Sequence, residues 1–495
     1  MAQDARPESV VSDWWLPEAG SEDSVPGTYS VLATGNSMIR LHRPIGGEAA
    51  LFSNSAIPHP LIHGVAFGKP VTLLNSRTKK FQWNFGLQAD IELHPHLAIE
   101  GLHLFQDELR LTEARVRIQG QDDWITSPRF TRSLNSDGSM KSVTMSTFPQ
   151  KVSWVQNGCA TIWDASSWRG NDSEVSISSK TEFHFLFEEP VLLTEFFDNH
   201  LRSLQVLMTM ITGERCGVEG LKFTDTTWEI DGSAPSKPHW VTARLRAPDA
   251  RGRRRVPELL VPFECFNWEA QAPAVFDLST AWAYSIEQWA LLLDSRFVWP
   301  VARFATAASA VEALDRILNP PEKPYAPDDE LIARVKEELK KTSLNGKDRG
   351  KIISGIKRPT ETSLDQRIAR LTELAPDAMK QLIDRPLWTN RVAKLRHVVS
   401  HGLESSEDFS RDTRALECGS EILLHILECA FLCHLGFNAN QINEIKMQHP
   451  STWQRKRIVD ECFDLLPKMP VQAIDGGSKP ESEEPAASAT ETPSA

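Results

Sequence analysis

The sequence predicts an α+β protein with a large β-rich amino-terminal domain, an all-helical domain and a disordered carboxy-terminal tail. Apolar residues alternate in short runs over residues 9–270, which is typical of strands, and recur at helical spacing over residues 276–467. Ten of the fifteen tryptophans precede residue 270, which favours aromatic packing in the β-rich half. Residues 470–495 are mostly Gly, Ser, Pro, Glu and Ala, which bury too little apolar surface to fold.

Composition restricts the class of protein. A chain of 495 residues with 41% hydrophobic content can form two or three domains. The net charge of −12 excludes a global basic surface for nucleic acid, so any such contact must be local. Seven cysteines, an odd number, and the lack of an export signal in residues 1–20 predict a cytoplasmic protein. The most apolar helical stretch, 422–437, is too short to cross a membrane.

In the β-rich half, strands are predicted at 29–32, 115–118, 183–187 and 241–245. Turn signals separate the runs at Pro26-Gly27, Gly46-Gly47 and Ser136-Asp137-Gly138. Between Pro190 and Gly213 the apolar residues change to helical spacing, which predicts one helix packed on the sheet.

The helical half begins with a predicted helix over 279–297, and a second helix follows Pro300. Phe304, Ala308, Val311 and Leu318 form an apolar stripe on this second helix. Asp315 lies within the stripe and Glu312 on its flank. An acid on an apolar face needs a partner, so we expect Asp315 to be paired.

Three further segments complete the helical half. Residues 337–359 are rich in lysine and contain glycines, which predicts a mobile basic loop. Ser363 and Asp365 are typical of a helix start before 368–374. A long helix is expected over 408–435, with Cys418, His425, Cys429 and Cys433 on one face. A straight helix cannot wrap these four around one zinc, because its ends would be about 22 Å apart, so the stripe is core or a dimer seam.

The stretch from Trp388 to Gly402 carries the chemistry. His397 and His401 are one helical turn apart, and Arg396 is adjacent to His397. Gly402 is typical of a helix end, where the chain can turn the His401 imidazole toward an anion. Histidine can move protons near neutral pH, and arginine can stabilise charge building up on phosphorus. These residues suit metal-independent cleavage of RNA, although an Arg or His near a helix end also commonly serves only the helix dipole.

Arg396-His397-Val398-Val399-Ser400-His401 resembles the Arg-polar-x-x-x-His signature of HEPN ribonucleases, which are helical. Arg391 and His397 fit a looser spacing, but only the later pair has a polar second residue, so we prefer Arg396 and His401. Two segments near the amino terminus, Asp13-Trp14-Trp15-Leu16-Pro17 and Pro26-Gly27-Thr28-Tyr29, resemble the start of the amino-terminal domain of ApeA-type HEPN proteins. The segment 308–314 is similar to the early helix of their HEPN domain.

The resemblance implies a bacterial anti-phage effector without a cofactor. Its β-rich half would be a sensor for a phage protein, and its helical half would dimerise or form a higher homo-oligomer and cut tRNA-like or other host RNA. The early-helix resemblance implies that Glu312 orients His401 or Arg396, although an ordinary surface ion pair is an equal alternative. His401 would be the main acid/base, with His397 in support.

Other candidate sites remain open. Lys347, Arg349 and Lys351, and the loop containing Arg253 and Arg254, are basic enough to contact RNA or can be solvated faces. His94, His96 and His103 suggest metal-dependent hydrolysis or incidental loop histidines. A different class of function is a HEPN module that binds RNA or dimerises without cleaving.

Overall fold

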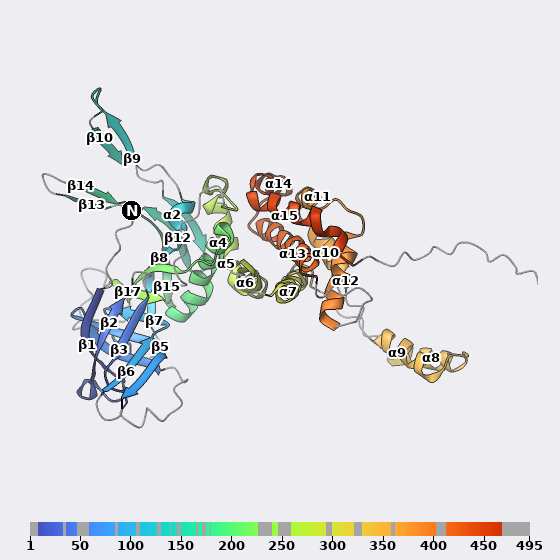
Figure 1. The fold of residues 1–495 in the computed structure, drawn as a ribbon, viewed down its shortest axis with the longest axis horizontal. Coiled ribbons are helices and arrows are strands. Elements are labelled where there is room, and N and C mark those ends of the chain that lie inside the picture. Colours follow the sequence, from blue (N-terminus) through green and yellow to red (C-terminus); the bar gives the residue numbers. More distant parts are fainter. Residues whose placement is uncertain are drawn as a thin grey trace, which may run out of the picture.

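The computed structural model describes residues 8–467 apart from 33–35, 47–58, 85–87, 105–108, 126–129, 139, 146–149, 165–166, 171–174, 179, 226–239, 246–258, 294–298, 321–328, 358–361 and 402–411. The predicted tail at 470–495 and the basic residues Arg253 and Arg254 lie outside the described residues. Strands occupy the amino-terminal half and helices the carboxy-terminal half, as predicted (Figure 1).

The first six strands close into an antiparallel barrel. They are β1 (Glu8–Trp15), β2 (Val25–Val31), β3 (Ser37–Leu41), β4 (His59–Ala66), β5 (Lys69–Asn84) and β6 (Gln88–His94), paired in the ring β1-β2-β3-β6-β5-β4. The Trp14 indole fills the barrel against Gly27 and Gly64, where a Cβ would collide with Leu41 or with the indole itself. The turn predicted at Pro26-Gly27 is therefore wrong, because this glycine lies within β2 and is needed for close packing.

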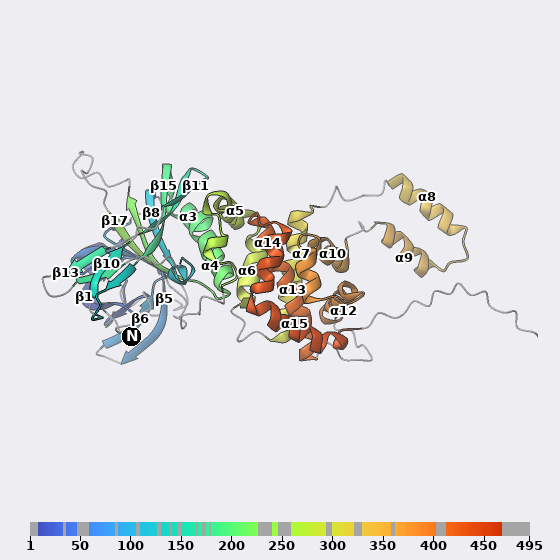
Figure 2. The same ribbon diagram turned by 90° about the horizontal axis from the view of Figure 1, so that it is seen from above.

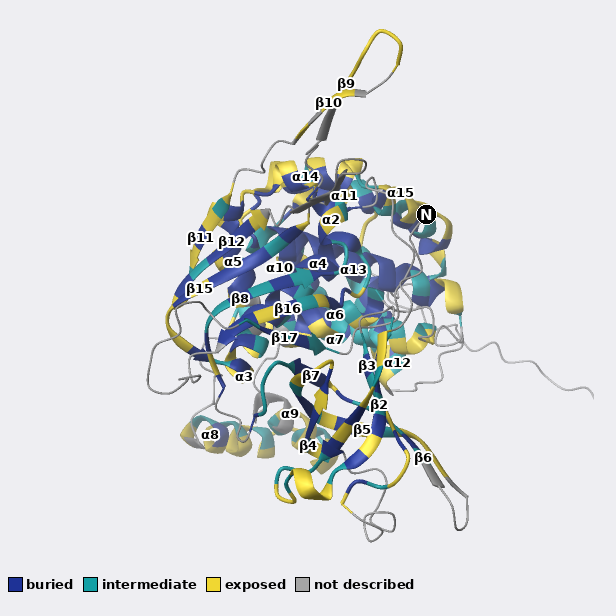
Figure 3. Ribbon diagram, turned by 90° about the vertical axis from the view of Figure 1, so that its left-hand side faces the viewer, coloured by how far each residue is buried: buried dark blue, intermediate teal, exposed yellow. Residues whose placement is uncertain are grey.

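β5 continues from the barrel into an open antiparallel sheet. Its first half pairs with β7 (Leu97–Glu100), and its second half pairs with β6. After β7 the sheet runs in the order β17 (Trp240–Leu245), β16 (Val218–Asp225), β8 (Arg110–Ile118), β15 (Thr181–Leu192), β12 (Gly158–Asp164) and β11 (Lys151–Val155). The predicted strands correspond to β2, β8, β15 and β17. Figure 3 looks onto the face of this sheet that the helices leave uncovered.

Two hairpins and several short helices decorate the sheet. The hairpins pair β9 (Phe130–Leu134) with β10 (Met140–Met145), through the predicted turn at 136–138, and β13 (Ser167–Gly170) with β14 (Val175–Ser178). The helix predicted between Pro190 and Gly213 is confirmed as α3 (Leu193–Phe196), the π-helical turn η2 (Phe197–Leu201) and α4 (Arg202–Thr212). Gly213 ends it in the left-handed conformation, at φ 65°. The short helices η1 (Ser21–Asp23), α2 (Gln121–Trp124) and η4 (Phe263–Cys265) join other elements.

The carboxy-terminal half is a helical bundle. Its elements are α5 (Trp268–Ala281), α6 (Ala283–Leu293), α7 (Pro300–Leu318), α8 (Asp329–Lys340), α9 (Gly346–Lys357), α10 (Leu364–Thr372), α11 (Pro376–Leu382), α12 (Trp388–His401), α13 (Thr413–His434), α14 (Ala439–Gln448), α15 (Pro450–Cys462) and η5 (Phe463–Leu465). α7 and α13 pack closely at the centre, where Gly419 leaves room for the Phe304 ring. The cysteine stripe of α13 is core, since Cys418, His425 and Cys429 are buried.

The helices differ from their predictions in two places. The single helix expected over 279–297 is wrong, because α5 ends at Ala281 and α6 starts at Ala283, with buried Trp282 between them. The loop expected over 337–359 is also wrong, because its residues form the end of α8 and all of α9. In Figures 1 and 2 these two helices pack on each other and stand away from the bundle.

One apolar core extends from the open sheet into the bundle. α5 makes this connection: the Trp268 ring stacks on Phe183 of β15, and its Nε1 donates to the Ala160 carbonyl at 3.0 Å. At the other end, the Gln271 amide of α5 donates to the Leu435 carbonyl at 2.9 Å. Figure 2 shows α4 and α5 between the sheet and the bundle. The two halves are therefore packed together over a common interior.

A buried ionic network fastens α13 to its neighbours. Glu428 accepts from Lys446 at 2.5 Å and from Arg455 at 2.5 and 2.8 Å, while Glu421 binds Arg455 and Arg303. Burial alone would raise the pKa of Glu428, but Arg455 and Lys446 hold that pKa well below its usual value. The network ties α7, α14 and α15 to the central helix.

Within the described residues, no helix is both long and apolar enough to cross a lipid bilayer.

Candidate functional site

The motif helix α12 packs apolar residues against the bundle and leaves Arg396, His397 and Ser400 accessible. Val392 and Leu395 are fully buried and Val398 nearly so, which fixes the helix against the bundle. Arg396 is about one-third exposed, and His397 and Ser400 are exposed. Because residues three and four apart share a helical face, the burial of 392, 395 and 398 turns Arg396 and Ser400 outward together.

Two groups hold the Arg396 guanidinium. Its Nε donates to Glu312 Oε1 of α7 at 3.0 Å, and one terminal nitrogen donates to Ser400 Oγ at 2.7 Å. The Glu312 side chain is only 20% exposed, so this carboxylate is partly shielded from water. A charged hydrogen bond on one side and a hydroxyl on the other orient the guanidinium plane. The predicted pairing of Glu312 with Arg396 is present.

A buried carboxylate on α7 holds the neighbouring helix α10 in place. Asp315, one turn after Glu312 on α7, is fully buried, and it accepts from Arg367 at 3.0 Å and Arg370 at 2.5 Å, both on α10. Asn319 donates to its other oxygen at 3.0 Å. The partner that an acid on an apolar face requires is thus a pair of arginines, and they fix α10 beside α7.

These elements enclose a cleft of about 390 Å³. Glu312, Arg396 and His397 line it together with residues 362–365 and with Arg316, Arg367 and Ala393. The α10 wall is well defined, since Ser363 and Gln366 form a capping box and Asp365 accepts from Asn390 of α12 at 3.0 Å. The helix start predicted from Ser363 is confirmed. Arginines, an imidazole and two carboxylates thus line one water-accessible space.

Arg391, the arginine of the looser motif spacing, has a structural role. Arg391 is 9% exposed, and its guanidinium donates to the Leu466 carbonyl at 2.5 Å and the Asp464 carbonyl at 3.2 Å. It also lies over the Phe463 ring, 4.3 Å from the centroid. Arg391 therefore anchors the end of the bundle and does not face the cleft. This arrangement favours Arg396 over Arg391.

His401 is the last residue of α12. It lies one turn after His397, so the backbone brings it to the same end of the helix as Arg396 and Ser400. Its side chain, like Gly402, is outside the described residues.

Two family models match the chain. ApeA N-terminal domain 1 matches residues 9–241, and Apea-like HEPN matches residues 306–441. The first match spans the barrel and the open sheet, and the second spans α7 to the start of α14 with the cleft inside it. The chain is an ApeA-type HEPN anti-phage protein. No curated protein and no solved structure matches it.

Outside the cleft of this ApeA-type chain, the described residues among those predicted to contact RNA lie on the projecting hairpin of α8 and α9. Lys347 and Lys351 of α9 are exposed, and Arg349 donates to the Thr342 carbonyl at 2.9 Å. At the carboxy-terminal end of α8, Lys340 and the next residue, Lys341, are each paired with a glutamate three residues earlier. α9 therefore carries the less neutralised cations of this arm.

The histidines of the barrel do not assemble as ligands. His94 Nε2 binds Glu92 at 2.6 Å, whereas His103 Nε2 donates to the Gly64 carbonyl at 2.8 Å and its ring stacks on His63. His96 is exposed. In the described part of the chain, no three His, Cys, Asp or Glu side chains form a group able to hold a metal ion.

Sequence reasoning missed three contributors to the HEPN cleft. Ser400 stands inside the motif, but nothing about a serine at this spacing signals that it will receive the Arg396 guanidinium. Arg367 and Arg370 carry a usable signal, since their spacing of three places both on one side of α10. That signal becomes informative once Asp315 is known to need a buried partner.

Proposed function

We propose that this ApeA-type HEPN protein is a metal-independent endoribonuclease in the bacterial cytoplasm. It cuts tRNA-like or other structured host RNA as a homodimer or higher homo-oligomer, and its amino-terminal half restrains it until a phage protein binds there. The arrangement that carries the proposal is the Arg396 guanidinium, held by Glu312 and Ser400 over an open cleft that His397 also lines.

The chemistry follows from the side chains. His401 takes the proton from a ribose 2′-OH, and the 2′ oxygen attacks phosphorus. Arg396 stabilises the negative charge that builds on the phosphoryl oxygens. The bond to the 5′ oxygen breaks, and that oxygen receives a proton from a second acid, for which His397 or the motif of a second copy is suited. The products carry a 2′,3′-cyclic phosphate and a free 5′-OH.

Cleavage by the purified full chain tests this proposal. Because the full chain is proposed to be restrained, a phage lysate is supplied as the source of the trigger. Incubation with tRNA and a structured RNA oligonucleotide in EDTA should then yield fragments ending in 2′,3′-cyclic phosphate, while an oligonucleotide with 2′-deoxyribose at the cut site should resist. Arg396→Ala and His401→Ala should each lower the rate by about 100-fold or more. The matched controls are Arg457→Ala, an exposed arginine on α15, and His96→Ala, an exposed histidine in the barrel domain.

The same assay separates the other classes of function. Binding of RNA without fragments, under conditions where a phage lysate is also supplied, would favour a non-catalytic HEPN module. Cleavage that EDTA abolishes would favour metal-dependent hydrolysis. Equal loss of activity in Arg396→Ala and Arg457→Ala would remove the assigned site.

A further inference from the structure

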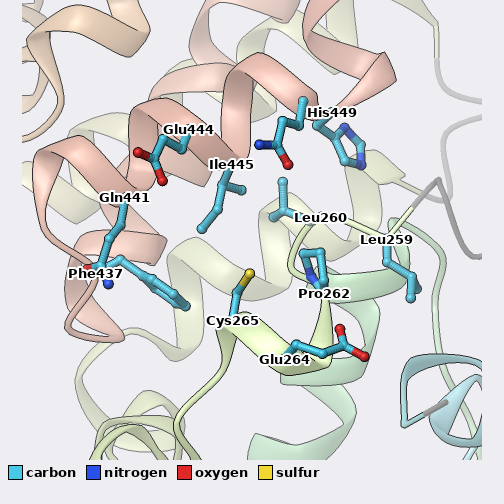
Figure 4. Close-up of a pocket in the computed structure, with 11 residues that line it drawn as sticks. Leu259, Leu260, Pro262, Glu264, Cys265, Phe437, Gln441, Glu444, Ile445 and His449 are labelled. Carbon is cyan, nitrogen blue, oxygen red and sulfur yellow. The ribbon is translucent and has the colours of Figure 1, made fainter. Parts of the chain in front are cut away.

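A second cavity lies where the β-rich half meets the bundle, and it shares no lining residue with the cleft. We call it the junction cavity. It holds about 550 Å³ between residues 259–265, which lead from the sheet into α5, and residues 437–449, which comprise α14 and its flanks (Figure 4). This volume is in the range of small-molecule sites. None of the residues proposed for RNA cleavage lines it.

The junction cavity has an apolar floor. Leu260, Phe437 and Ile445 are each less than a tenth exposed, and in Figure 4 Leu260 and Ile445 face each other across the space. Such a floor favours a ligand with an aliphatic or aromatic portion, since burying apolar surface contributes about 25 cal/mol per Å².

The rim of the cavity is acidic. Glu264 and Glu444 stand on opposite walls in Figure 4, one from η4 and one from α14. The described lining contains no lysine or arginine, so its formal charge is −2 with histidine neutral. An anion would be repelled, and a purely apolar ligand would cover the carboxylates and the Gln448 amide without giving them partners.

We propose that the junction cavity binds an organic cation, an alkylammonium or alkylguanidinium with an apolar stem. The stem lies on Leu260 and Ile445, and the charged end pairs with the carboxylates of the rim. Because the walls come from the segment leaving the sheet and from the bundle, a bound cation holds these two parts together. This site is independent of the proposed ribonuclease chemistry.

Cys265 provides a direct readout. It lines the cavity with its thiol directed inward in Figure 4, and it is the exposed cysteine among the seven of the chain. Agmatine, which joins a guanidinium and an ammonium by an aliphatic chain, should slow the reaction of Cys265 in the full-length protein with N-ethylmaleimide. The adduct is followed by peptide mass spectrometry, and protection should saturate with agmatine concentration.

Two variants and one neutral probe test whether the junction cavity binds an organic cation. Glu444→Gln should raise the half-protecting agmatine concentration by about fivefold, whereas Glu461→Gln, an exposed glutamate on α15, should leave it unchanged. The proposal is overturned if agmatine gives no saturable protection, if 1-pentanol protects as well as agmatine does, or if both variants behave alike, which would indicate only attraction to an acidic protein.

Discussion

The orientation of the Arg396 guanidinium depends on contacts that come from two helices. Glu312 belongs to α7 and Ser400 to α12, so the guanidinium is held relative to both walls of the cleft. An arginine free to rotate would spend binding energy on becoming ordered at each turnover, whereas this one is already directed. Glu312 and Ser400 are therefore positioning residues in the proposed reaction.

Neutralising the Glu312 carboxylate tests this positioning. Glu312→Gln should lower kcat by about 10- to 100-fold and change KM little, because the guanidinium loses orientation but keeps its charge. Ser400→Ala should have a smaller effect in the same direction. The unfolding free energy should fall by no more than about 1 kcal/mol, because the ion pair is partly exposed. Single-turnover cleavage and urea unfolding measure the two quantities; wild-type kcat in Glu312→Gln would contradict the assignment.

Acid should destabilise the fold through His200. Burial among aromatic rings lowers the pKa of His200 from 6.5 to about 4. The unfolded chain therefore binds a proton below pH 6.5 that the folded chain excludes, and the unfolding free energy falls from pH 6.5 to about pH 4. The contribution is about 3 kcal/mol. His200→Gln should flatten that part of the profile in urea unfolding at a series of pH values; an unchanged slope would show that His200 titrates normally.

At this scale the sequence predicted the pairs that charge and burial demand. Asp315 on an apolar face requires a partner, and Glu312 was placed opposite Arg396 by resemblance. Neither argument predicts the contact of Ser400 with Arg396, because an exposed serine hydroxyl can equally well bind water. Choosing Arg396 over Arg391 rested on the residue that follows each, whereas the structure supports the choice through the burial of Arg391.

Among the elements, the hairpin of α8 and α9 departs most from expectation. Its lysines and glycines are typical of a loop, yet Gly346 begins α9 and Asn345 caps it, accepting from the Asp348 backbone at 2.9 Å. Apolar Ile332 is buried on α8, so the two helices support each other. Local composition cannot reveal such mutual packing. The α5–α6 break is similar, since tertiary burial of Trp282 interrupts a continuous helical pattern.

The α9 cations should contribute to RNA affinity without affecting chemistry. Replacing Lys347, Arg349 and Lys351 together by Gln should weaken RNA binding and reduce the slope of log affinity against log salt by about 2, because three phosphate contacts are lost. The rate at saturating RNA should stay unchanged. The control replaces Lys456, which is partly exposed, and Arg457, which is exposed, both on α15. Equal slopes of log affinity against log salt in both variants would indicate that the hairpin is solvated and does not contact RNA.

On the scale of the whole molecule, the shared interior connects the β-rich half with the bundle that contains the cleft. α5 inserts Trp268 into the sheet and Gln271 toward the end of α13, while α7 carries Glu312 in the same bundle. The sequence predicted two halves but not this sharing, because apolar spacing shows that a face is buried and not what covers it. A change in the sheet can reach the bundle through packed side chains without a flexible linker.

Separating the halves should release the proposed activity. A fragment of residues 282–467 keeps α6, which packs on α7, and omits α5, which packs on the sheet. Its induction in a bacterial host should stop growth, whereas the full chain should be tolerated and the fragment carrying Arg396→Ala should be harmless. Growth curves and circular dichroism of the purified fragment are the measurements. A folded, harmless fragment would contradict restraint by the amino-terminal half.

The strand β5 sets how the barrel can move. The first half of its sixteen residues pairs with β4 of the barrel on one side and with β7 of the open sheet on the other, and the second half pairs with β6 of the barrel. Tyr29 of the barrel and Arg244 of the sheet also share the Glu100 carboxylate. A hinge between the two would have to break a continuous ladder of backbone hydrogen bonds. The barrel is thus a rigid extension of the sheet. A protein that binds the barrel and displaces it would therefore move the sheet as well.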